Sequence, residues 1–262
     1  MDSESLPSGM VTFVFTDIEG STQLLRRLGE QYEDVLRRSA EVLIQTWTTH
    51  GGHPLPGAGD STFAAFASPD AAIAACVDGQ RRLAAEPWPA HGRPAVRMGA
   101  HTGLASPRGG EYVALAVHQA VRVMTAAHGG EVLVSEQCAN EAGRLHDVQL
   151  VPLGCFRVRD FETPPRLFRV AARGLQREFP AVRAVPVDGH NLVRPPTPLV
   201  GRQQDVIAVV SAAAPGRVLM LLGPGGVGKT RLAVEAGLVA ARGWDDGVWL
   251  VDLAPLQDAS LI

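Results

Sequence analysis

A glycine-rich turn in the C-terminal part of the chain carries the sharpest chemical motif. It satisfies the pattern G-x-x-x-x-G-K-[ST] and lies between an apolar run and an expected helix. Such a turn wraps backbone N–H groups around an anion, while the lysine contacts the β- and γ-phosphates and the hydroxyl binds Mg²⁺. The alternative is an ordinary turn between a strand and a helix. The pattern assigns phosphate binding to Gly223, Gly225, Gly226, Gly228, Lys229 and Thr230.

Two aspartates form a second candidate site. Asp17 follows the apolar run 10–15, and Asp60 sits at the tip of an expected hairpin over 53–66. Two carboxylates at adjacent strand ends, with a backbone carbonyl between them, suit a pair of Mg²⁺ ions on a triphosphate. The alternative is that both residues are solvated turn formers.

The elements that must position these residues follow from the hydrophobic pattern. Apolar side chains recur every three to four residues from Leu24 to Trp47, which predicts one helix that Gly51 and Gly52 end. The turn at Gly59 predicts a hairpin with its return strand over 61–66. Further helices are expected over 70–85, 111–127 after a short strand, and 137–145, and further strands over 95–104, 131–134, 148–158 and 166–170.

Strands and helices alternate without a strict βαβ repeat, which predicts an α/β sandwich with a mixed sheet over 9–172. A Pro-rich linker is expected over 173–199. The remaining residues, 200–262, are expected to form an incomplete P-loop fragment, with strands 218–222 and 248–251, the second ending before Asp252, and a helix over 231–241.

Composition limits the classes of function. The chain has 262 residues, a formal net charge of −3 and a pI near 6.2. This balance argues against direct nucleic-acid binding. No apolar run is long enough to span a bilayer, the start lacks a signal peptide, and three scattered cysteines predict neither disulfides nor a zinc site. We therefore expect a soluble, cytoplasmic protein. Lys229 is the one lysine among 24 basic residues.

Four stretches together resemble the class III adenylate and guanylate cyclase catalytic domain: FTDIEGST, GDSTFAAF, VRMGAHTG and EYVALAVHQAVRVMTAAHGGEVLVS. The resemblance covers about residues 9–172. It implies a ferredoxin-like mixed sheet and a homodimer with its active sites between the protomers. It also implies two Mg²⁺ or Mn²⁺ ions per site, ATP or GTP as substrate, and attack of the ribose 3′-hydroxyl on the α-phosphate with loss of pyrophosphate.

Four positions of this family are intact. Asp17 and Asp60 match the metal-binding aspartates, and Ile18 matches the residue that lends a backbone carbonyl. Arg122 matches the arginine that stabilises charge in the transition state.

Three positions depart from the family. The base-selecting lysine is replaced by Pro56, which cannot donate a hydrogen bond, and the second base-selecting position is Glu111. The ribose-orienting asparagine is replaced by His118, which either hydrogen-bonds the sugar or packs at the dimer interface. A glycine of the family is Ala114. These changes predict weak activity with poor selection between ATP and GTP.

The C-terminal part resembles the opening of the STAND-type (AAA-type) P-loop ATPase module of LuxR-type transcriptional regulators. The resemblance rests on the glycine-rich turn and on PLVGR, which ends at Arg202. A complete module needs more strands, so this fragment is expected to hold phosphate loosely without hydrolysing ATP.

Two functions remain open. The first is a homodimeric cyclase with low activity, which produces a cyclic nucleotide. The second is a catalytically silent sensor or dimerisation module of a split LuxR-type regulator, whose ATPase and DNA-binding parts lie in a downstream partner. A third hypothesis, ATP sensing through Lys229, concerns the C-terminal fragment alone.

Overall fold

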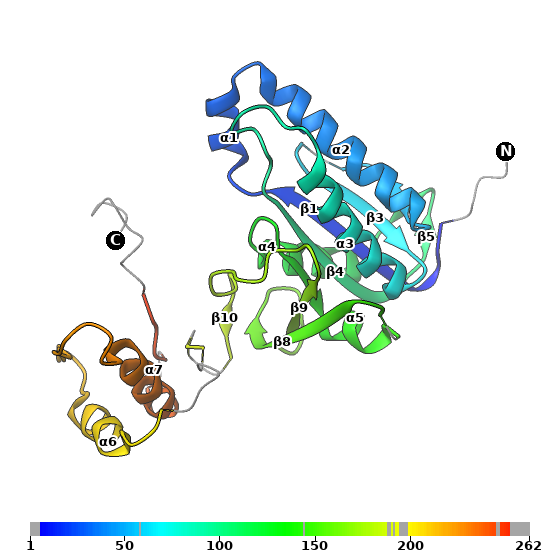
Figure 1. Cartoon of the computed structure of the whole chain (residues 1–262). Coiled ribbons are helices and arrows are strands. Elements are labelled where there is room, and N and C mark those ends of the chain that lie inside the picture. The colour runs from blue at the N-terminus through cyan, green and yellow to red at the C-terminus, as the bar shows by residue number, and fades with distance from the viewer. Residues whose placement is uncertain are drawn as a thin grey trace. The chain divides into compact units, whose positions relative to one another are not determined.

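The computed structural model describes residues 6–57, 59–143, 145–187, 190, 192–193, 199–244 and 247–251. Contacts divide the chain into two compact units, Met1–Ala184 and Val185–Ile262 (Figure 1). The expected linker prolines at 195, 196 and 198, and Asp252, lie outside the described residues. Among the described helices, none has both the length and the apolar character that a bilayer span requires.

A mixed sheet forms the centre of the first unit. Its strands lie in the order β8-β9-β7-β4-β1-β3-β2, and β4 pairs parallel with β7, whereas β1 pairs antiparallel with β3 and β4. A separate hairpin joins β5 to β6. The bounds are β1 Gly9–Ile18, β2 His53–Leu55, β3 Thr62–Phe66, β4 Val96–Ala105, β5 Pro107–Arg108, β6 Glu111–Tyr112, β7 Val132–Ser135, β8 Val148–Arg157 and β9 Arg166–Ala172.

Helices cover both faces of this sheet. Along β1, Val14 and Ile18 face a core shared with α2 and α3, whereas Val11 and Phe13 face a second core shared with α4. This alternation is what a strand buried on both faces requires. The helices are α1 Ser21–Leu28, α2 Gln31–Thr49, α3 Pro69–Ala85, α4 Leu115–Thr125 and α5 Glu136–Glu141. The expectation of a mixed α/β fold is confirmed.

The single helix expected from Leu24 to Trp47 is wrong, because α1 and α2 are separate. The break lies at Gly29, whose φ is +55° with ψ at −124°. Only glycine adopts this conformation readily, since a Cβ would collide with the backbone. The periodicity of apolar residues continues across Gly29, so the sequence pattern did not reveal the break between the two helices.

Residues 173–184, which we call the strap, form the end of the first unit and pack against the rest of it. The backbone N–H of Arg183 donates to the carbonyl of Ala126 (3.0 Å), and Arg81 Nη2 donates to the carbonyl of Arg173 (2.8 Å). Leu175 packs against the larger core. The boundary between the two units therefore falls later than the end of the expected catalytic domain at residue 172.

The second unit contains β10 Val185–Pro186, α6 Gln203–Ala212, α7 Lys229–Ala240 and the 3₁₀ turn η1 Ala241–Gly243. The strands expected over 218–222 and 248–251 are wrong. Val218 is 91% exposed, and Val248 forms only an isolated bridge with His190. A strand needs a neighbour to satisfy its backbone groups. In the described part of this unit no strand pairs with 218–222, so β-prone residues alone did not make one.

Candidate functional site

The C-terminal end of β1 places Asp17 beside the neighbouring strand β4. The two strands pair with Asp17 opposite Arg97, and Arg97 Nε donates to Asp17 Oδ2 at 2.9 Å. The second guanidinium nitrogen, Nη2, donates to the same oxygen. Both side chains are 18% exposed. One carboxylate oxygen of Asp17 is therefore held by a cation, and Oδ1 receives no hydrogen bond from this arginine.

The carbonyl of Ile18 is oriented by the residue that follows it. The backbone N–H of Glu19 donates to the carbonyl of Ala95 (2.9 Å), on the β4 side of β1. Because the peptide unit is planar and trans, the Ile18 carbonyl points in the opposite direction. That direction is the β3 side of β1, and Asp60 lies in the turn that precedes β3.

Asp60 lies next to these groups through the pairing of β1 with β3. Thr16 pairs with Thr62, and the two hydroxyl oxygens lie 2.7 Å apart in the interior. Extending this antiparallel register by two residues sets Asp60 opposite Ile18. Both residues also line one small crevice beneath α2. The observed pairing itself ends at Thr16 and Thr62, so the shared crevice is the observation that sets Asp60 near Ile18.

Tyr32, on α2, lies within reach of both carboxylates. Burial raises the pKa of its hydroxyl, the negative charge of Asp60 raises it further, and Asp17 adds to the same effect, against a hydrogen bond with Ser21 that lowers it. The two aspartates thus act on one phenol from adjacent strand ends.

These groups have the chemistry of a divalent-cation site. Carboxylate and carbonyl oxygens are the ligands that Mg²⁺ and Mn²⁺ prefer. In the described part of the chain no three His, Cys, Asp or Glu side chains gather closely enough to hold a metal without help. A metal here would therefore be held by Asp17, Asp60 and the Ile18 carbonyl, with water or a bound nucleotide supplying its remaining oxygens. The residues present fit that role.

Arg122 and His118 stand apart from this cluster, on α4. Arg122 Nε donates to Asp160 Oδ2 at 2.7 Å, in the loop between β8 and β9, while Asp17 is bound to Arg97. His118 is exposed one helical turn before Arg122. Ile18 and Asp60 thus line one crevice, whereas Arg122 is paired with Asp160.

The two base-selecting positions lie on different elements. Pro56 is exposed directly after β2, and Glu111 is exposed on β6 opposite Arg108. Ala114 caps the N-terminus of α4 without a side-chain hydrogen bond.

In the second unit, the glycine-rich turn leads into α7. Gly226 and Gly228 have φ of +75° and +87°. Lys229 Nζ donates to the carbonyls of Gly223 (2.9 Å) and Pro224 (3.0 Å). Arg202, from the PLVGR stretch, donates through Nη1 to the carbonyl of Val227 (2.9 Å). The ammonium thus lies over its own turn, and Thr230 is exposed.

Sequence reasoning missed Arg97, Tyr32 and Glu19. Arg97 alternates with buried residues on β4, so the sequence pattern alone did not indicate which residue it contacts. Only the register of β1 against β4 makes it the partner of Asp17, and a single sequence does not contain that register.

Comparison with known protein sequences finds relatives of this chain. An uncharacterized protein of Mycobacterium tuberculosis is 31% identical over 181 residues, which cover 68% of this chain and 61% of that protein. A protein of Mycosarcoma maydis named adenylate cyclase is 31% identical over 160 residues, 52% of this chain and 6% of its own length. The chain thus spans less than two thirds of the curated relatives it matches. No protein-family model matches it.

Among solved structures, an adenylate cyclase of Trypanosoma brucei superposes with a TM-score of 0.59 at 23% identity, covering 67% of this chain and 97% of that one. The guanylate cyclase domain of a Catenaria anguillulae protein, solved with GTP, gives a TM-score of 0.55 at 18% identity, with 63% and 97% covered. The described fold is that of class III cyclase catalytic domains.

Proposed function

We propose that the first unit, which has the class III cyclase catalytic fold, converts ATP or GTP into a cyclic nucleotide and pyrophosphate. The observation that carries the proposal is that Ile18, next to Asp17 at the end of β1, and Asp60, in the turn before β3, line one crevice. Mg²⁺ or Mn²⁺ at these oxygens would withdraw charge from the triphosphate and favour ionisation of the ribose 3′-hydroxyl. The Mycosarcoma maydis relative and the Trypanosoma brucei neighbour, both adenylate cyclases, and the Catenaria anguillulae guanylate cyclase domain support the same reaction.

The chain's own residues divide this work. Asp17 is already paired with Arg97, so the attraction of its carboxylate for a metal cation is partly offset. The carbonyl of Ile18 would supply an uncharged oxygen ligand. Arg122 would stabilise negative charge on the α-phosphate after leaving Asp160. Within one chain Arg122 and Asp17 have different partners. This separation supports a homodimer in which each protomer lends its Arg122 to the other's site.

Activity is expected to be weak. Pro56 offers no donor to the purine, and Glu111 is exposed on a two-residue strand. His118 is solvent-exposed in the single chain, so it is free either to reach a sugar or to contact a second protomer. Poor discrimination between ATP and GTP follows from the loss of a base-reading cation.

The test is an assay of purified chain with ATP or GTP and Mn²⁺, with the cyclic product measured by mass spectrometry. The product should fall about 100-fold or more in Asp17→Ala. Asp34→Ala is the matched control, because Asp34 is an exposed acid that pairs with Arg37 on α2. No product above the Asp17→Ala background would reject the cyclase proposal and favour the alternative, a silent dimerisation or sensor module of a split LuxR-type regulator.

A second candidate function concerns the glycine-rich turn, which we propose as a site for the phosphates of ATP. The supporting observation is Lys229 Nζ, which lies over the turn and is bonded only to carbonyls there. In equilibrium dialysis, the ATP binding that remains in Asp60→Ala should be lost when Lys229→Ala is added to that variant. Loss of all ATP binding in Asp60→Ala alone would assign that binding to the first unit.

A further inference from the structure

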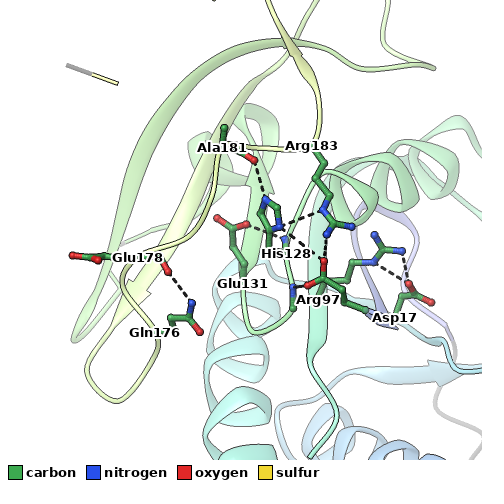
Figure 2. Close-up of polar contacts among 10 residues, drawn as sticks. Asp17, Arg97, His128, Glu131, Gln176, Glu178, Ala181 and Arg183 are labelled. Carbon is green, nitrogen blue, oxygen red and sulfur yellow. Dashed lines mark hydrogen bonds and ion pairs between the residues drawn. The ribbon is translucent and has the colours of Figure 1, made fainter. Parts of the chain in front are cut away.

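The strap, residues 173–184, contacts the rest of the first unit close to the metal-site strand end. Figure 2 shows Arg183 reaching from the strap toward His128, with Arg97 and Asp17 beside them. Arg183 Nη2 forms an ion pair with Glu19 Oε1, and Glu19 is the residue after Ile18. A segment expected to be a linker thus supplies a charge two residues from Asp17.

Glu19 is held at three points. Its backbone N–H binds the Ala95 carbonyl, its Oε2 accepts from the backbone N–H of Gly129 at 2.6 Å, and its Oε1 accepts from Arg183. The side chain is about one quarter exposed, so water competes for it only in part. Removing Arg183 would leave Oε1 without its charged donor.

Contacts other than the ion pair with Glu19 also hold Arg183 in place. Its backbone N–H donates to the Ala126 carbonyl (3.0 Å), and its Nε donates to His128 Nδ1 (3.2 Å). Because Nδ1 accepts, the ring's Nε2 carries the proton, and it donates to the Ala181 carbonyl in the strap (2.8 Å). The guanidinium is therefore held in one position.

The turn beneath this cluster is anchored by a buried ion pair. Glu131 is 1% exposed, accepts from Arg169 Nε at 2.6 Å, and accepts from the His128 backbone N–H at 3.0 Å. The same arginine lies 5.1 Å from the ring centroid of Phe179, which belongs to the strap. Strap, turn and β1 end thus form one connected set of contacts.

We propose that Arg183 and Glu19 are positioning residues for the metal site, and that the strap fixes the direction of the Ile18 carbonyl. The reasoning is geometric. The Glu19 N–H and the Ile18 carbonyl belong to one planar peptide, so a side chain that fixes Glu19 also fixes that oxygen. This inference rests on the proposed metal site of the cyclase function. Groups outside the first ligand layer are known to set metal affinity by orienting the ligands.

The test is Mn²⁺ binding to the full chain, with free Mn²⁺ followed by electron paramagnetic resonance and with no nucleotide present. In Arg183→Ala the dissociation constant should rise about tenfold. Arg183→Lys keeps a charge near Glu19 and should recover part of that loss. Arg177→Ala is the matched control, because Arg177 is an exposed arginine of the same strap. It should bind Mn²⁺ as the unchanged chain does.

Two further measurements separate positioning from folding and from the metal site itself. Hydrogen exchange in Arg183→Ala should speed up at residues 18–20 and 128–131 while the rest of the sheet stays protected. General loss of protection would make Arg183 merely structural and reject the proposal. Asp17→Asn must lose Mn²⁺ binding. If it does not, the metal site and the proposed function both fail. If Asp17→Asn loses binding while Arg183→Ala keeps it, the strap inference alone fails.

Discussion

At the scale of single residues, His101 shows how the core constrains protonation. It is 5% exposed on β4, its Nδ1 lies 2.8 Å from Ser135 Oγ, and its ring meets Phe161 edge-on. Burial lowers the pKa of His101 to about 4, against a hydrogen bond with Gln119 that raises it. His101 is thus a core residue whose ring has both a polar and an aromatic partner.

Stability should therefore fall in acid. The folded pKa lies below the unfolded value near 6.5, so the unfolded chain binds the proton first. The contribution is fully present above pH ~6.5 and is lost as the pH falls toward 4, to a total of about 3 kcal/mol. Urea unfolding from pH 7 to 4 measures it. His101→Gln should show a flatter profile than the unchanged chain, and parallel profiles would contradict this assignment.

The candidate site was partly predictable at this scale. Asp17, Asp60 and the Ile18 carbonyl could be picked out because a family motif fixes their spacing, and two of these residues, Ile18 and Asp60, line one crevice. Arg97 and Arg183 could not, because their roles depend on strand register and on chain that returns from 80 or more residues away. A local sequence pattern does not report either of these long-range contacts.

At the scale of elements, the contact of α4 with β4 is unusually close. A Cβ built on Gly99 would lie 2.1 Å from the backbone nitrogen and 2.3 Å from the Cα of Met124. The helix therefore lies directly on the strand at this point. Since α4 also carries Arg122 and His118, the glycine fixes the height of two candidate site residues above the sheet.

Gly99→Ala should push α4 outward. Overpacking against backbone cannot be relieved by a rotamer change, so we expect a loss of about 2–3 kcal/mol in unfolding free energy. Chemical denaturation measures this loss, and any cyclase activity should fall with it. Gly243→Ala is the control, because no heavy atom lies within 4 Å of its added Cβ. Equal stability of the two variants would show that α4 moves freely.

Most elements of the first unit were predictable because the spacing of apolar residues and the positions of turn residues indicate the same boundaries. The hairpin at Gly59 and the strand of 95–104 are examples, with β4 observed at Val96–Ala105. The run 218–222 shows the limit of this reasoning. Its composition favours a strand, yet its backbone finds no strand neighbour in the described part of the unit, and Leu222 is 83% exposed. Pairing is a property of the fold, which a local pattern does not report.

At the scale of the whole molecule, the first unit ends after the strap. Ion pairs and hydrogen bonds tie residues 173–184 to Glu19, His128 and Ala126. The Pro-rich composition that suggested a linker is equally compatible with an extended segment that crosses a surface, since prolines need no backbone donor. Composition alone did not distinguish these two.

Truncation separates the two descriptions. A chain ending at residue 187 should melt at the same temperature as the first unit of the full chain. A chain ending at residue 172 loses the strap contacts, worth about 2–3 kcal/mol, and should melt about 5–10 °C lower. Differential scanning calorimetry measures both. Identical melting temperatures would mean that the strap adds nothing to folding.

The position of the Lys229 ammonium has a practical consequence. Apart from the amino terminus, it is the only primary amine that the sequence contains. Its lone pair is available for acylation only when the ammonium leaves the carbonyls of Gly223 and Pro224 and loses a proton. A reagent selective for amines therefore labels one side chain, that of Lys229. The rate of this labelling reports on the conformation of the glycine-rich turn. The chain carries a built-in chemical reporter, which mass spectrometry of its proteolytic peptides can read without any substitution.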